Sequence, residues 1–161
     1  MQKVLALIDA QNLWYTPKND WNKKLDYKKL YSLLKKENPD QKIEPYIYLI
    51  LDPLVSSDAF ISLLRCIGYV PRIKFIFQSD DKEFSNTDWS TDMVREGRNL
   101  IKDADYTSVL VSSGNCAFID LFNYAGMLGK TTNLFCFEKD YSEKFSQKVD
   151  KITFLDKNVC F

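Results

Sequence analysis

The chain contains no histidine among its 161 residues, and this absence narrows the chemistry open to it. Without an imidazole the protein cannot use a Ser-His-Asp or Cys-His nucleophile, a histidine metal ligand, or an unperturbed side chain that titrates near neutrality. Any catalysis must therefore use carboxylates, amides, hydroxyls, thiols, lysine or arginine.

The chain also lacks net charge, because 22 Lys plus Arg balance 22 Asp plus Glu. A neutral total gives no global argument for nucleic-acid binding, although it is compatible with a local basic patch. No apolar stretch approaches the roughly 18 residues of a membrane helix, and the first apolar run has no signal-peptide cleavage site. We therefore expect a cytoplasmic protein with no membrane association.

Cysteine pairs of the C-x-x-C type are missing as well. The four cysteines are widely spaced in apolar segments, at Cys66, Cys116, Cys136 and Cys160. This spacing predicts reduced thiols in the core of the protein and gives no sign of a zinc site or a redox pair.

Strand-like and helix-like segments alternate from end to end, without a repeat or a linker, and the length fits a single domain over residues 1–161. The alternation predicts an α/β fold with a parallel sheet. Expected strands cover residues 4–8, 46–51, 70–77, 107–112, 132–137 and 152–155, with Pro71 favouring an edge position for the third. Expected helices start at Asp26 and at Ser56 or Ser57, and cover residues 88–102, 117–128 and 142–149. Polar loops are expected around Pro17 and over residues 78–87.

Polar side chains follow the first and fourth expected strands. Asp9 and Asn12 come after the first strand, and Ser113 and Asn115 come after the fourth. Ligands of open α/β sheets bind beyond the carboxyl ends of the strands, where the strand order reverses. Each residue alone could also serve a turn or a helix cap, and it is the pairing of the two strand ends that favours a functional site.

A third group of polar residues lies on the helix expected from residue 88. Asp88, Asp92 and Glu96 share one face at intervals of four, where like charges repel. Two interpretations stand open for Asp92: a solvated acidic face near a helix N-terminus, or a ligand of a divalent cation. Arg95 and Arg98 could neutralise these acids, and for Glu96 we favour the solvated face.

These residues resemble the NYN domain family of the PIN-like nucleases. The opening "LIDAQNLWYT" is similar to the family's Asp-x-x-Asn-Leu motif, and "YTSVLVSSGNCAF" is similar to its fourth strand and Ser-Gly-Asp-x-Asp-Phe turn. Weaker similarity continues through "FISLLRCIGYVPRIKFIF", "STDMV" and "KVDKITFLD". The resemblance implies a three-layer α/β/α sandwich with a mainly parallel five- or six-stranded sheet, PIN-like or Rossmann-like, and hydrolysis of RNA with Mg²⁺ or Mn²⁺.

Carried over position by position, the resemblance makes Asp9 the metal ligand of the first strand and Asn12 its helper. Asp92 most resembles the acid of the helix, with Asp88 as the alternative, and Ser113 would hydrogen-bond the turn after the fourth strand and hold Asp9. The two aspartates of the family's turn are here Asn115 and Ala117. Asn115 still offers a carbonyl oxygen, whereas Ala117 offers none, and Asp120 is a weak substitute.

The sequence therefore leaves two main functions open: a metal-dependent ribonuclease with a reduced acidic site, or a pseudonuclease that binds RNA or a protein partner. A metabolite-binding Rossmann-like domain ranks last, because no glycine-rich loop follows the first strand. RNA contacts are expected from basic and aromatic residues, and for Trp14 we favour a place in the core. A homodimer through the helix that contains Phe118 is left open. The basic candidates are Lys23, Lys24, Lys28, Arg95 and Arg98, and the aromatic candidates for stacking are Trp14, Tyr15 and Trp21.

Overall fold

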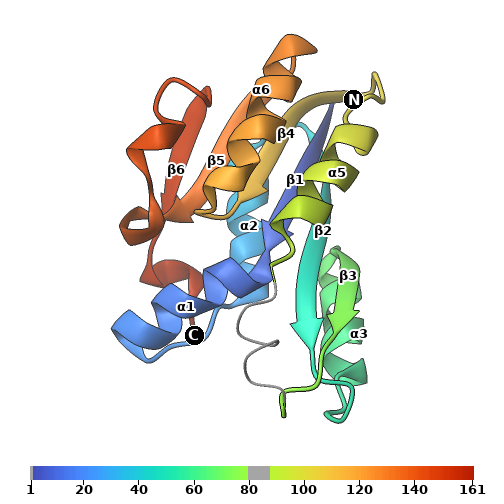
Figure 1. Ribbon diagram of the computed structural model, residues 1–161, viewed down its shortest axis with the longest axis vertical. Coiled ribbons are helices and arrows are strands. Elements are labelled where there is room, and N and C mark those ends of the chain that lie inside the picture. The colour runs from blue at the N-terminus through green and yellow to red at the C-terminus, as the bar shows by residue number, and fades with distance from the viewer. Residues whose placement is uncertain (1, 80–87) are drawn as a thin grey trace.

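A single parallel sheet of six strands forms the centre of the protein. The computed structural model describes residues 2–79 and 88–161. The strands are β1 (Lys3–Asp9), β2 (Lys42–Leu51), β3 (Val70–Phe75), β4 (Tyr106–Ser112), β5 (Thr131–Phe137) and β6 (Lys151–Leu155). Their spatial order is β3-β2-β1-β4-β5-β6, so that the direction of winding reverses between β1 and β4 (Figure 1). All six expected strands are present.

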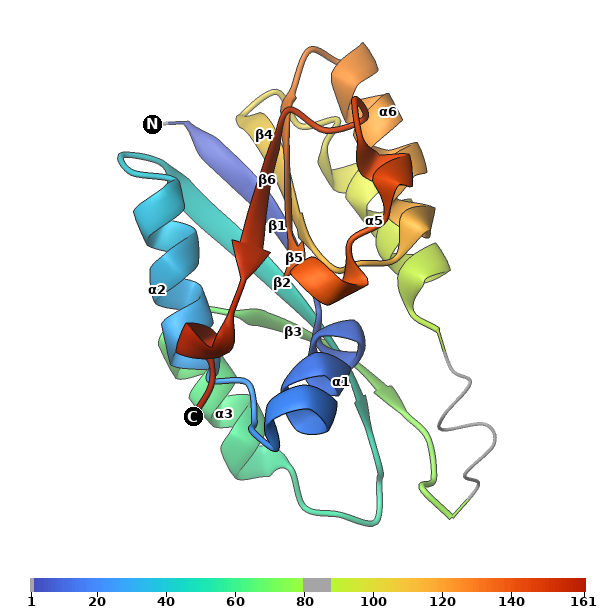
Figure 2. The same cartoon turned by 90° about the vertical axis from the view of Figure 1, so that its left-hand side faces the viewer.

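Helices cover both faces of this sheet. The helices α2 (Tyr27–Glu37) and α3 (Asp58–Ile67) lie on one face, and α5 (Ser90–Leu100) and α6 (Ile119–Met127) lie on the other (Figure 2). In β1, Val4, Ala6 and Ile8 pack toward the first face, whereas Leu5 and Leu7 pack toward the second. This two-sided burial explains why β1 is a continuous apolar run, and the α/β/α sandwich is confirmed.

The helix α1 (Ala10–Trp21) lies where the sequence suggested a polar loop. The carboxylate of Asp9 caps it by accepting a hydrogen bond from the Asn12 backbone N–H at 3.2 Å. Pro17 lies inside the helix and is buried together with Leu13 and Thr16. The expectation of a loop was wrong because this packing outweighs the cost of a proline in a helix interior.

Several local predictions are confirmed and one is wrong. Asp26 caps α2 through its side chain, Gly68 ends α3, and β3 is an edge strand as Pro71 suggested. The expected helix over residues 142–149 is only a short 3₁₀ turn, η3 (Glu143–Phe145), because Gln147 has a left-handed backbone with φ of 63°. Of the loop expected over residues 78–87, only residues 78 and 79 are among the described residues.

The cysteines are free thiols, but they are not all in the core. Cys136 and Cys160 are buried, Cys116 is half-buried and Cys66 is exposed. The prediction of core thiols was therefore wrong for Cys66, which lies on the solvent side of α3. Within residues 2–79 and 88–161, no helix has the length and apolar character needed to cross a membrane.

Candidate functional site

The ends of β1 and β4 bring the polar residues of the two motifs together. The strands are neighbours, and the register pairs Ile8 with Ser112, so that the residues that follow lie side by side. The Ser113 hydroxyl donates a hydrogen bond of 2.9 Å to the Asp9 carboxylate. The turn thus holds Asp9, as the resemblance implied for Ser113.

A second contact ties α1 to the same turn. The side-chain carbonyl of Asn12 accepts a hydrogen bond of 2.9 Å from the Gly114 backbone N–H, and the Asn115 N–H donates to the Ser113 hydroxyl at 3.1 Å. We call Asp9, Asn12, Ser113 and Gly114 the Asp9 network. In it Asn12 acts as a positioning residue, because its carbonyl oxygen is used to fasten the turn.

Asp9 is the buried charge of this network, with 5% of its surface exposed. Burial raises the pKa of the Asp9 carboxyl to about 6, against the opposing effect of its two hydrogen-bond donors. The negative charge of Asp88 raises this pKa further. Asp88 is therefore the acid of the α5 region whose charge acts on Asp9, and its own carboxylate accepts a hydrogen bond from the Ser90 N–H at 2.8 Å.

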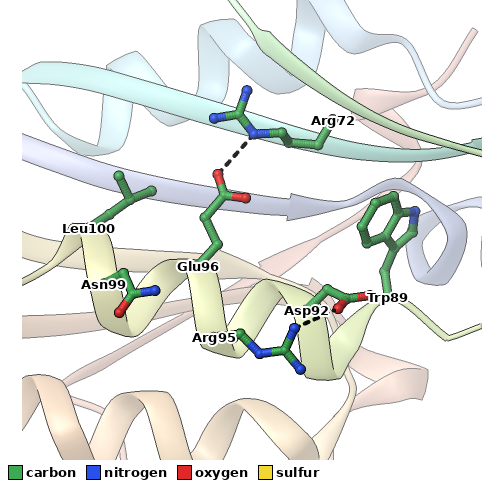
Figure 3. A pocket seen from close by; sticks show the side chains of 7 residues that line it. All are labelled: Arg72, Trp89, Asp92, Arg95, Glu96, Asn99 and Leu100. Carbon is green, nitrogen blue, oxygen red and sulfur yellow. Dashed lines mark hydrogen bonds and ion pairs between the residues drawn. The ribbon is translucent and has the colours of Figure 1, made fainter.

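Asp92, the other predicted helix ligand, has cationic partners. Its carboxylate forms ion pairs with Lys74 of β3 at 3.2 Å and with Arg95 at 3.3 Å. It lines an open pocket of about 550 Å³ beside α5, together with Arg72, Trp89, Arg95, Glu96, Asn99 and Leu100 (Figure 3). The sequence left Asp88 and Asp92 open as the helix ligand; the charge of Asp88 acts on Asp9, whereas Asp92 is paired with two cations.

The remaining charged residues of α5 also have partners within the protein. Glu96 pairs with Arg72 at 2.9 Å, and Figure 3 shows the two side chains meeting between helix and strand. The guanidinium of Arg98 lies 4.4 Å from the centre of the Tyr124 ring on α6. Arg95 and Arg98 thus have intramolecular partners, and their role in RNA binding stays a prediction.

Asn115 sits at the site, but its carbonyl oxygen is in use. It accepts a hydrogen bond of 2.9 Å from the Ala117 N–H and so caps the 3₁₀ turn η1 (Cys116–Phe118). Ala117 is exposed and carries no ligand atom, and Asp120 is exposed in the first turn of α6. The β4 side therefore contributes a rigid turn without a carboxylate.

Asp140 is a residue at this edge that the sequence analysis missed. It ends the 3₁₀ turn η2 (Glu138–Asp140) directly after β5, and its carboxylate accepts a hydrogen bond of 2.6 Å from the Thr16 hydroxyl of α1. A Cβ atom on Gly114 would lie only 2.6 Å from the Asp140 backbone oxygen, so this close approach requires glycine. The rule that polar residues after parallel strands share one edge could have identified it.

The lysines predicted to contact RNA lie beyond the opposite end of α1. Twelve helical residues separate Asp9 from Asn22, a span of roughly 18 Å at 1.5 Å per residue. The Lys23 ammonium donates to the Phe161 carbonyl at 2.9 Å, and the Lys24 carbonyl accepts from the Phe161 N–H at 2.9 Å. The structure does not bring these lysines to the Asp9 network.

The acids at this edge could hold at most a sparsely liganded cation. Within residues 2–79 and 88–161, no group of three or more acidic or cysteine side chains is arranged to hold a metal ion. Asp9 and Asp88 supply two carboxylates, a number that suits Mg²⁺, which binds one or two carboxylates and retains several waters. The donor set fits such a hard cation and does not fit a closed zinc site.

Comparisons with known proteins agree with this architecture. A protein of unknown function from Vibrio parahaemolyticus has a TM-score of 0.82 at 19% identity, with 99% of this chain and 96% of that chain covered. MurG of Acinetobacter baumannii has a TM-score of 0.50 at 8% identity, covering 98% of this chain and 43% of that one. Both likenesses concern the fold alone, and the search of curated proteins finds no match.

The family comparison covers nearly the entire chain. The NYN domain model matches residues 3–156, which include both strand-end motifs and the Asp9 network. This match confirms the resemblance read from the sequence and indicates a nuclease-like, PIN-like fold. The chain belongs to the NYN domain family.

Proposed function

We propose that the protein hydrolyses RNA phosphodiesters with the help of Mg²⁺ or Mn²⁺ at the Asp9 network. The observation that carries this proposal is the buried Asp9 carboxylate, which Ser113 and the Asn12 N–H hold at the end of β1 beside the charge of Asp88. Two carboxylates without a compensating cation repel each other, and a bound divalent cation would relieve this repulsion.

The chain's own residues have separate roles in this proposal. Asp9 and Asp88 would hold the cation, and Ser113 and Asn12 fix Asp9 and the β4 turn. A divalent cation at this place supplies a Lewis acid for the phosphoryl group and lowers the pKa of a bound water, which requires no histidine. Burial of Asp9 keeps bulk water from competing for its carboxylate.

A second function is favoured by the β4 turn. Asn115 and Ala117 replace two family carboxylates, and the Asn115 carbonyl is engaged by the Ala117 N–H. Fewer carboxylates weaken cation affinity, so the same fold is compatible with a pseudonuclease that binds RNA or a protein partner without cutting. Measured cleavage is the property that separates these two functions.

The test is cleavage of single-stranded and structured RNA in Mg²⁺ or Mn²⁺ by the wild type and by three matched variants. Asp9→Asn should lower the rate at least a hundredfold, and Asp88→Asn should lower it and raise the metal concentration needed for half-maximal rate. Asp92→Asn is the control, because its carboxylate faces Lys74 and Arg95, and it should keep most of the rate.

Two results would contradict the nuclease proposal. Cleavage that persists in EDTA, or that is unchanged in Asp9→Asn, would place the activity elsewhere or in a contaminant. Absence of cleavage, together with a melting temperature that millimolar Mg²⁺ or Mn²⁺ does not raise, would support the pseudonuclease instead. Loss of activity in Asp92→Asn but not in Asp88→Asn would reverse our assignment of the helix ligand.

A further inference from the structure

Two large aromatic side chains are exposed on α1 within two turns of Asp9. Trp14 is 44% exposed and Tyr15 is 41% exposed, so the sequence-based placement of Trp14 in the core was wrong. Their ring centres lie 5.3 Å apart at an interplanar angle of 77°, an edge-to-face pair. We call these two residues the aromatic platform.

A cation accompanies the platform. The Lys18 ammonium, one turn further along α1, lies 3.9 Å from the centre of the Trp14 ring, within the range of a cation–π interaction. An exposed aromatic surface beside a positive charge matches the chemistry of a nucleotide, whose base has a flat π-face and whose phosphate is an anion.

The other tryptophans of the chain are engaged within the protein. Trp21 is half-buried, with its ring 5.6 Å from that of Phe137, and the Trp89 indole N–H donates to the Leu49 carbonyl at 3.0 Å. Trp14 is the exposed tryptophan of α1, the helix that Asp9 caps at the end of β1.

The distance along α1 suits a base close to the reacting phosphate. Trp14 lies five positions after Asp9, which corresponds to roughly 7.5 Å along the helix axis. This is about two stacked-base intervals of ~3.4 Å each. Both residues belong to one rigid element, because Asp9 caps the helix that carries Trp14.

We infer that the aromatic platform is a nucleobase subsite, which stacks one base of an RNA strand about one or two nucleotides from the phosphate at Asp9. The inference rests on the proposed function, which supplies RNA as the ligand. Contacts of the RNA strand with Trp14 and Lys18 then determine which of its phosphates lies at Asp9. Lys18 covers one face of the Trp14 ring and meets the phosphate of the nucleotide that stacks on the other face, and Tyr15 packs edge-to-face with Trp14.

The test measures binding apart from cleavage. Every variant carries Asp9→Asn, so that a fluorescently labelled single-stranded RNA oligonucleotide stays intact while its Kd is measured by anisotropy. Trp14→Ala should raise Kd about tenfold, which lies within the range for loss of one stacked base. Trp14→Phe should restore most of the affinity.

The control is Phe154→Ala on the edge strand β6, because Phe154 is 45% exposed and so matches Trp14 in exposure. It should change Kd by less than about twofold. A scan with oligonucleotides that lack one base at a time then locates the stacked base. Removal of that base should weaken binding to the Asp9→Asn protein about tenfold. In the protein that also carries Trp14→Ala, removal of the base should weaken binding no further, which is the signature of a direct contact.

Unchanged affinity in Trp14→Ala, or an abasic penalty that persists in that variant, would overturn the subsite. These outcomes are independent of the cleavage assay on the wild type. Cleavage with no effect of Trp14→Ala on Kd removes the subsite and leaves the nuclease. Binding that depends on Trp14 without any cleavage keeps the subsite and removes the nuclease.

Discussion

The stability of Asp9→Asn relative to the wild type should be greater at neutral pH than at acid pH. The reason is that the wild type loses stability when its buried Asp9 carboxyl is ionised. The folded-state pKa of Asp9 is about 6, whereas an unfolded aspartate titrates near 4. A shift of about two units corresponds to about 3 kcal/mol of lost stability when the group is ionised in both states.

The sign follows from which state loses its proton first. Below about pH 4 the carboxyl is protonated in the folded and the unfolded chain, and the cost vanishes. Between about pH 4 and 6 the unfolded chain ionises first, and above pH 6 the full cost applies. The wild type is therefore destabilised by this group as the pH rises from 4 to 6, and asparagine removes the dependence.

We expect the stability difference, Asp9→Asn minus wild type, to grow by about 2 kcal/mol between pH 4 and pH 7. For a chain of this size that corresponds to about 4–8 °C in melting temperature, measured by thermal unfolding across the pH range. Asparagine also loses one acceptor toward Asn12 or Ser113, a roughly constant offset of about 1 kcal/mol. A gap between the two melting curves that stays constant from pH 4 to 7 would refute the reasoning.

Three further predictions concern glycines and thiols. Gly97→Ala should destabilise the protein by about 1–2 kcal/mol, because its Cβ would lie 2.8 Å from a Leu7 methyl group. Gly126→Ala would meet nothing within 4 Å and should stabilise the protein by up to about 1 kcal/mol. Chemical denaturation measures the free energy of unfolding of both variants. Gly114→Ala should cost about 1–3 kcal/mol through its backbone contact at 2.6 Å and should lower any cleavage rate, and normal stability in this variant would contradict the described turn. Cys66 should react with a thiol reagent in the folded protein, whereas Cys136, whose pKa burial raises to about 12, should react only on unfolding.

The sheet could be predicted from the sequence because its strands are covered on both faces. Apolar runs such as residues 4–8 and 109–111 favour strands buried on both faces, and the strand-end rule then placed Asp9 beside Ser113. These features follow from local composition and from connection rules that only a few topologies satisfy.

The features that escaped prediction depend on contacts between distant segments. Pro17 suggested a loop, but its burial and the Thr16 bond to Asp140 keep α1 helical. The ion pairs of Asp92 with Lys74, and the exposure of Trp14, depend on how α5 and α1 are rotated about their axes. Periodicity gives the apolar side of a helix, but it does not say which polar residue meets a partner.

The edge strand β3 gives the ion pairs beside α5 a second consequence. An outermost strand exposes a row of backbone donors and acceptors on which another chain could pair and start an aggregate. Pro71 removes one donor from this row, and Arg72 and Lys74 place charges along it while they pair with Glu96 and Asp92. Replacing Arg72 and Lys74 with neutral residues should therefore promote self-association at high concentration without changing the chemistry at Asp9.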